Sequence, residues 1–133
     1  MHFRRHFAAA VLAFGLPLTA GADEFSAEDM QRRQDQFMQV VQEGRALWTS
    51  GEIGTNGVAC AQCHPNATNI HPETYPKFQK QMGRVIAMWE MFNWCLRNPL
   101  EGEPMEADDP RMIALQAYAI YERRGVELEP GKH

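Results

Sequence analysis

The chain has 133 residues, and 13 lysines and arginines against 17 aspartates and glutamates give a net charge of −4 at neutral pH. This length favours one domain with a modest core. The basic residues form no cluster along the sequence, which argues against a nucleic-acid-binding protein.

The first 22 residues have the order of a secretory signal peptide. Arg4 and Arg5 precede the apolar run AAAVLAFGLPLTAGA, which ends in small residues. The run is short for a membrane-spanning helix, although a retained membrane anchor is the alternative. We therefore expect residues 1–22 to be removed during export to the periplasm. Residues 23–133 then form the mature domain, with no membrane span.

The first predicted element of the mature chain is a helix over residues 27–49. Ser26 and Asp29 form a Ser-x-x-Asp start signal. Apolar and small residues then recur at helical spacing: Phe37, Val40 or Val41, Gly44, and Leu47 or Trp48. A glycine lowers helix stability, so Gly44 predicts the close approach of another segment at this point.

The stretch CAQCH carries the clearest chemical signal. Cys60 and Cys63 are spaced so that both sulfurs can form thioethers with one edge of a porphyrin, and His64 then lies beneath the iron. A thioredoxin-type redox pair would need a βαβ context that the sequence lacks. A zinc site would need two further ligands, and His71 and Cys95 form no second paired cluster. Export also favours haem attachment, so we predict one covalently bound haem c.

The rest of the chain predicts two more helices. Residues 65–76 contain three prolines and indicate an irregular segment. A second helix is expected over 77–97, with one face formed by Val85, Met88, Met91, Phe92 and Cys95. Asp109 caps a third helix that begins at Pro110 and ends near Arg123 to Gly125, with an apolar face of Ile113, Ala117, Ile120 and Tyr121. The predicted fold is all-α, with three main helices and no sheet around one haem.

Two resemblances extend this prediction. The stretches EGRALW, CAQCH and DDPRMIALQAYAIYERRG resemble a class I cytochrome c domain, in which a first helix with a glycine crosses a last helix with an aromatic residue. That resemblance pairs Gly44 with Tyr118 or Tyr121. The stretch FNWCLRNPLEGEPMEADDPRMIALQAYAIYERRG is similar to the haem domains of SoxA and the thiosulfate dehydrogenases. The matching residues are Asn93, Cys95, Gly102, Pro104, Asp108, Asp109, Ala117 and Tyr118.

The SoxA resemblance implies that Cys95 is the second axial ligand of the iron. The residues support this independently, because Cys95 has no cysteine partner once haem consumes Cys60 and Cys63. An odd cysteine in an exported protein is reactive, intermolecular or ligated, and a buried structural cysteine is the remaining alternative. Met105 is the rival ligand, because class I cytochromes place a methionine before the last helix. Other methionines are expected in the core, and His71 is expected on the surface.

Electron transfer is the function expected first, with His64 and Cys95 holding a single iron. Its partner would be an exported redox protein, either another cytochrome or a dehydrogenase. The family resemblance suggests a place in sulfur-compound oxidation. One alternative is a haem subunit of a thiosulfate-oxidising enzyme, with Cys95, Arg84 and Arg97 as candidate catalytic residues and Lys77 and Lys80 nearby. A gas-binding haem sensor is another alternative.

The resemblance also shows a difference in haem number. This sequence holds one C-x-x-C-H motif. The thiosulfate dehydrogenases carry a second haem, and SoxA works with a haem-bearing partner.

Overall fold

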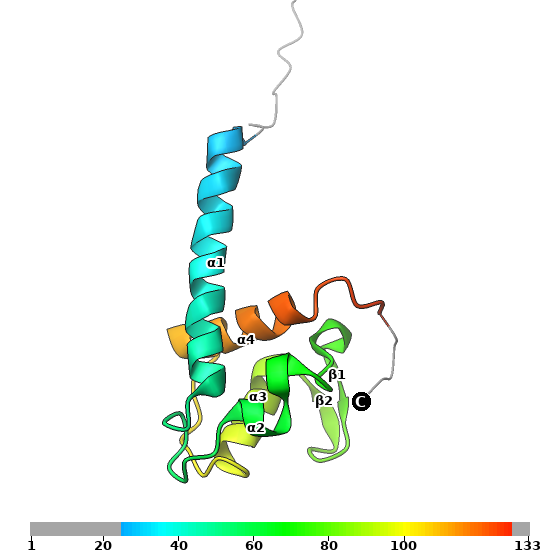
Figure 1. Cartoon of the computed structure of the whole chain (residues 1–133). Helices are drawn as coiled ribbons and strands as arrows, with labels where there is room; N and C mark the ends of the chain where they lie inside the picture. Colours follow the sequence, from blue (N-terminus) through cyan, green and yellow to red (C-terminus); the bar gives the residue numbers. More distant parts are fainter. Residues whose placement is uncertain (1–24, 129–133) are drawn as a thin grey trace, which may run out of the picture.

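The computed structural model describes residues 25–128 (Figure 1). Its three main helices are α1 (Ala27–Thr49), α3 (Met88–Arg97) and α4 (Pro110–Glu122). A short helix, α2 (Cys60–Cys63), and two 3₁₀ turns, η1 (Pro65–Ala67) and η2 (Pro72–Thr74), lie between α1 and a small hairpin. The predicted signal peptide lies outside the described residues. No helix in residues 25–128 is long and apolar enough to cross a membrane.

Helix α1 confirms the predicted bounds. Ser26 accepts a hydrogen bond from the Asp29 backbone N–H, and the Asp29 side chain accepts one from the Ser26 backbone N–H. This reciprocal cap satisfies two backbone donors that a helix start would otherwise leave free. Only the C-terminal half of α1 is covered, and the N-terminal half extends beyond the rest of the molecule (Figure 1).

Helices α1 and α4 cross at Gly44. A Cβ atom at this position would lie 1.9 Å from the Ala114 carbonyl oxygen and 2.8 Å from the Tyr118 Cβ atom. Only a glycine allows the two backbones to approach so closely. Tyr118 is therefore the aromatic partner, and the glycine–aromatic crossing is confirmed.

The segment predicted as a helix over 77–97 begins with an antiparallel hairpin instead. Strands β1 (Lys77–Gln79) and β2 (Arg84–Ile86) pair in the register Phe78 opposite Val85. The turn at Gly83 has φ of +67°, a backbone conformation that glycine adopts readily and that interrupts a helix. Val85 is consequently an exposed strand residue and not part of the predicted helix face. The expectation of no sheet is corrected by this one small hairpin.

Helix α4 begins as predicted, because Asp109 accepts a hydrogen bond from the Arg111 backbone N–H and Pro110 occupies the first helical position. Its buried face agrees with the predicted one at Ala117 and differs from it at two isoleucines. Ile113 and Ile120 are exposed, whereas the core contains Met112, Ala114, Leu115, Ala117, Tyr118 and Ala119. The close backbone approach at Gly44 places Ala114 and Tyr118 against α1, and this crossing determines which face of α4 is buried.

Candidate functional site

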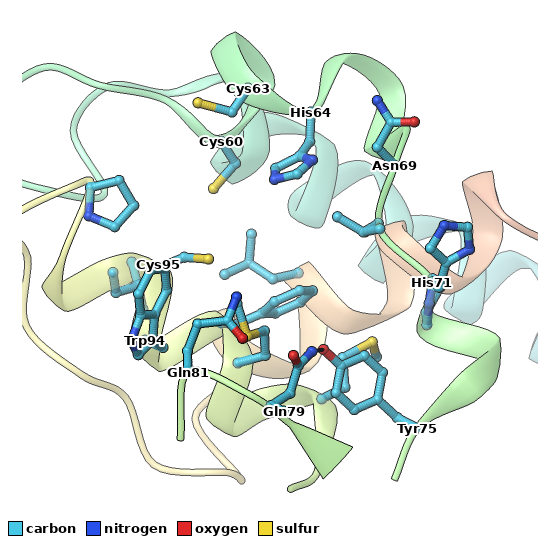
Figure 2. Close-up of a pocket in the computed structure, with 18 of the residues that line it drawn as sticks. Cys60, Cys63, His64, Asn69, His71, Tyr75, Gln79, Gln81, Trp94 and Cys95 are labelled. Atoms are coloured by element: carbon cyan, nitrogen blue, oxygen red, sulfur yellow. Dashed lines mark hydrogen bonds between the residues drawn. The ribbon is translucent and has the colours of Figure 1, made fainter. Parts of the chain in front are cut away.

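A cavity of about 930 Å³ collects the cysteines and histidine singled out from the sequence. Cys60, Cys63 and His64 come from α2 and its end, and Cys95 comes from α3 (Figure 2). All four side chains line the same cavity, although up to 35 residues separate them in sequence. A volume of this size lies in the range of cofactor and ligand sites.

The orientation of His64 is set by two contacts. Its Nδ1 atom lies 3.0 Å from the carbonyl oxygen of Thr68. A carbonyl oxygen only accepts hydrogen bonds, so Nδ1 carries the proton and Nε2 keeps its lone pair for a metal. Trp48 donates its indole N–H to the His64 carbonyl oxygen across 2.9 Å. Helical spacing in the sequence places Trp48 on the apolar face of the first helix and does not single out Thr68, because neither contact with His64 has a spacing signature.

Burial controls the chemistry of two of the cysteines. Desolvation raises the pKa of the Cys60 thiol, and separately that of the Cys95 thiol, to about 11. Each would therefore be a neutral thiol at pH 7 unless it forms a thioether or binds a metal ion. A thiolate at Cys95 would need a nearby cation, such as a metal ion, to stabilise its charge.

The rival ligand Met105 lies in the core below α3. Its backbone N–H donates to Asn93 Oδ1 across 2.8 Å, and its carbonyl accepts from Asn93 Nδ2 across 2.7 Å. Its side chain packs with Leu96, Leu100 and Met112. Among the described residues that line the cavity, Cys95 is present and Met105 is not.

The two candidate arginines do not reach the cavity wall. Arg84 is exposed on β2 and pairs with Glu90 across 2.5 Å, and Arg97 is exposed at the end of α3. The hairpin instead brings Lys77 and Lys80 to the cavity. The predicted helix would have put Lys77, Lys80 and Arg84 on one side, and the hairpin separates them.

The expectation that His71 lies on the surface was wrong. Its side chain is only 11% exposed, lines the cavity, and places Nδ1 2.9 Å from Glu73 Oε1. Desolvation raises the pKa of Glu73, but hydrogen bonds from its own backbone and from His71, together with the charge of Arg123, outweigh it and leave the pKa below 4.5. The short 3₁₀ turn η2 creates this pair by folding residue 73 back toward residue 71.

The donor set fits a covalently attached haem. Two thiols stand at one side of the cavity, an imidazole offers a free Nε2, and a half-buried thiol lies on another wall (Figure 2). Much of the remaining lining is apolar and includes Met88, Met91, Phe92, Leu96 and Leu115. In the described part of the chain, no group of three or more His, Cys, Asp or Glu residues is placed to hold a metal ion by itself.

Comparisons with known proteins agree with this site. The family model for the SoxA/TsdA cytochrome c domain matches residues 43–128. The SoxA subunit of L-cysteine S-thiosulfotransferase from Rhodovulum sulfidophilum is 30% identical over 113 residues, which cover 83% of this chain and 39% of that protein.

A solved structure shows the same fold. A chain of SoxXA from P. pantotrophus matches with a TM-score of 0.62 and 19% identity, over 80% of this chain and 44% of that one. The chain thus spans about two fifths of the length of the curated relative. It belongs to the SoxA/TsdA cytochrome c domain family, and its cofactor is a covalently bound haem c.

Proposed function

We propose that this protein is an exported monohaem cytochrome c that transfers single electrons in the periplasm. In this proposal Cys60 and Cys63 would form the two thioethers, and His64 and Cys95 would hold the iron. The observation that supports it is the meeting of all four side chains in one cavity. Met105, held in the core by Asn93, is the less suitable second ligand.

A bound haem supplies one-electron exchange between ferric and ferrous iron. The chain's own residues would tune that exchange. Thr68 fixes the tautomer of His64, and the apolar walls limit the access of water. A thiolate at Cys95 favours ferric iron, so we expect a potential well below that of a His/Met cytochrome.

The relatives suggest sulfur-compound oxidation as the setting. One is a subunit of a thiosulfotransferase and another is part of SoxXA, and both are longer than this chain. We infer a redox partner that is itself exported, either a second cytochrome or a dehydrogenase. With one C-x-x-C-H motif, this chain would hold one electron at a time.

Spectroscopy of the purified haem protein tests the axial ligands. Wild type should give a low-spin ferric EPR spectrum typical of thiolate ligation, and Cys95→Ala should lose it. Met105→Leu is the matched control and should keep the wild-type spectrum. A thiolate signal that survives in Cys95→Ala, or a clearly positive potential in wild type, would contradict the proposed ligand set.

A second candidate function is a haem subunit of a thiosulfate-oxidising enzyme. Two observations favour it. The Rhodovulum relative is a subunit of L-cysteine S-thiosulfotransferase. Lys80 is exposed and lines the same cavity as Cys95, where it could attract an anion. Joining two thiosulfates through a new S–S bond releases two electrons, so a partner haem would have to take the second. Steady-state assays with thiosulfate and an electron acceptor decide this. No turnover, alone or with partner cytochromes, would exclude it.

A further inference from the structure

One wall of the cavity is polar, and it is built from the segment 71–81. Its polar lining residues are His71, Tyr75, Lys77, Gln79, Lys80 and Gln81. Figure 2 shows His71, Tyr75 and Gln79 on the side of the cavity away from Cys60 and Cys63. No acidic side chain lines the cavity within residues 25–128. The wall therefore offers hydrogen-bond donors and positive charge to an anion.

The chemistry of haem attachment says which anion would face this wall. The vinyl groups that form thioethers lie at one edge of the porphyrin, and the two propionates project from the opposite edge. Attachment at Cys60 and Cys63 would therefore direct the propionates toward the segment 71–81. Two carboxylates entering a largely apolar cavity need hydrogen-bond donors, because an unpaired buried charge is strongly destabilising.

Tyr75 is the donor with the best support on this wall. Gln79, only 7% exposed, donates from Nε2 to the Tyr75 hydroxyl oxygen across 2.8 Å (Figure 2). A hydroxyl that accepts this bond keeps its own hydrogen for another acceptor. Burial raises the pKa of Tyr75, so the hydroxyl stays protonated at neutral pH.

Lys77 adds positive charge beside this hydroxyl. Its Nζ atom lies 4.7 Å from the centroid of the Tyr75 ring. Burial lowers the pKa of Lys77, and the charge of Glu73 partly offsets this. An additional anion near Lys77 would reduce the cost of burying its charge. Besides Tyr75, the titratable side chains that line the cavity are His71, Lys77 and Lys80 on this wall and Cys60, Cys63, His64 and Cys95 elsewhere. His71 also pairs with Glu73.

We propose that Tyr75 donates a hydrogen bond to a haem propionate, and that Gln79 and Lys77 position and assist it. This inference rests on the attachment through Cys60 and Cys63 in the proposed function. It does not depend on which residue is the second axial ligand.

The test follows the propionates directly by ¹³C NMR, in haem labelled at its carboxylates. Tyr75→Phe removes one hydrogen bond to an ionised carboxylate. The proton affinity of one propionate should therefore rise about tenfold, which moves its titration to higher pH. Tyr121→Phe also removes one tyrosine hydroxyl, but outside the cavity, and should leave both titrations unchanged. The ferric EPR spectrum should be that of wild type in both variants.

A measurement on the wild type covers the case in which Tyr75→Phe does not fold. In the reduced, diamagnetic protein, the ring protons of Tyr75 should give nuclear Overhauser effects to a propionate methylene group. Absence of these effects, or unchanged propionate titrations in haem-loaded Tyr75→Phe, would overturn the inference. A changed EPR spectrum in Tyr75→Phe would also overturn it, by showing that Tyr75 acts at the iron. Failure of the proposed function itself would appear separately, as wild-type protein without covalent haem.

Discussion

The indole of Trp48 holds the backbone of His64 through a hydrogen bond of 2.9 Å between Nε1 and the carbonyl oxygen. Trp48 is almost fully buried and also packs its ring against Phe92 and Tyr118. This one side chain therefore joins the α1–α4 core to the segment that carries the predicted iron ligand. A substitution that disturbs the packing of Trp48 should therefore also disturb the position of His64.

The first prediction concerns this contact. Trp48→Phe keeps an aromatic ring but removes the N–H donor and leaves a small void. We expect the free energy of unfolding of the haem protein to fall by about 1–3 kcal/mol, as measured by urea denaturation. Trp89→Phe is the control, because Trp89 is partly buried but packs against a different cluster, made of Leu96, Leu100, Met105 and Met112. A larger loss in Trp89→Phe than in Trp48→Phe would contradict the role of the hydrogen bond.

The second prediction concerns the crossing of α1 and α4. Gly44→Ala places a methyl group at the position that is 1.9 Å from the Ala114 carbonyl oxygen. The clash is with backbone, which cannot rotate away, so the helices must separate. We expect a loss of at least about 2 kcal/mol in thermal or urea unfolding, despite the better helix propensity of alanine. Gln42→Ala, on the exposed side of α1, should change stability by less than about 0.5 kcal/mol.

The third prediction concerns Asn93, which makes two buried hydrogen bonds to the backbone of Met105. Asn93→Ala leaves both Met105 groups without these partners in the core. The expected destabilisation is about 2–4 kcal/mol, read from the shift of the urea midpoint at constant m-value. Asn98→Ala is the control, because Asn98 is exposed and bonds only the Trp94 carbonyl through its side chain. Equal effects of the two substitutions would show that the loop does not depend on Asn93.

The sequence predicted much of this fold because the strongest signals were local. The Ser26–Asp29 cap, the Asp109–Pro110 start and the glycine of the helix crossing each have a fixed residue type at a fixed position. The C-x-x-C-H motif likewise needs no tertiary information. These features account for α1, α4 and the haem prediction.

The features that the sequence missed depend on distant contacts or weak local signals. Residues 77–86 follow neither a clear strand pattern nor a clear helix pattern. The sequence therefore allows a helix that continues into α3 as readily as it allows a hairpin. The turn at Gly83 converts these residues into a hairpin, which moves Lys77 and Gln79 to the cavity and Arg84 away from it. His71 and Tyr75 flank the 3₁₀ turn η2, and both line the cavity. None of these placements has a sequence spacing that identifies it.

The fourth prediction is a dependence of stability on acid pH that comes from Glu73. Desolvation alone would raise the pKa of this carboxyl, but hydrogen bonds from its backbone and His71 and the charge of Arg123 lower it overall. A carboxyl whose pKa is lower in the folded than in the unfolded chain stabilises the fold above its unfolded pKa of about 4.5. That stabilisation is lost as the pH falls below this value.

Glu73→Gln should therefore make unfolding less sensitive to pH below about 4.5 and lower stability at pH 7. Thermal melts of the haem protein from pH 7 to pH 3 measure both effects. Glu103→Gln changes the net charge equally at an exposed position and should leave the pH profile close to that of wild type. The reason is that an ionised carboxylate stabilises the fold only where the folded chain favours the ionised form more than water does. A profile of Glu73→Gln that coincides with the wild-type profile would mean that the His71 contact does not favour the ionised carboxylate.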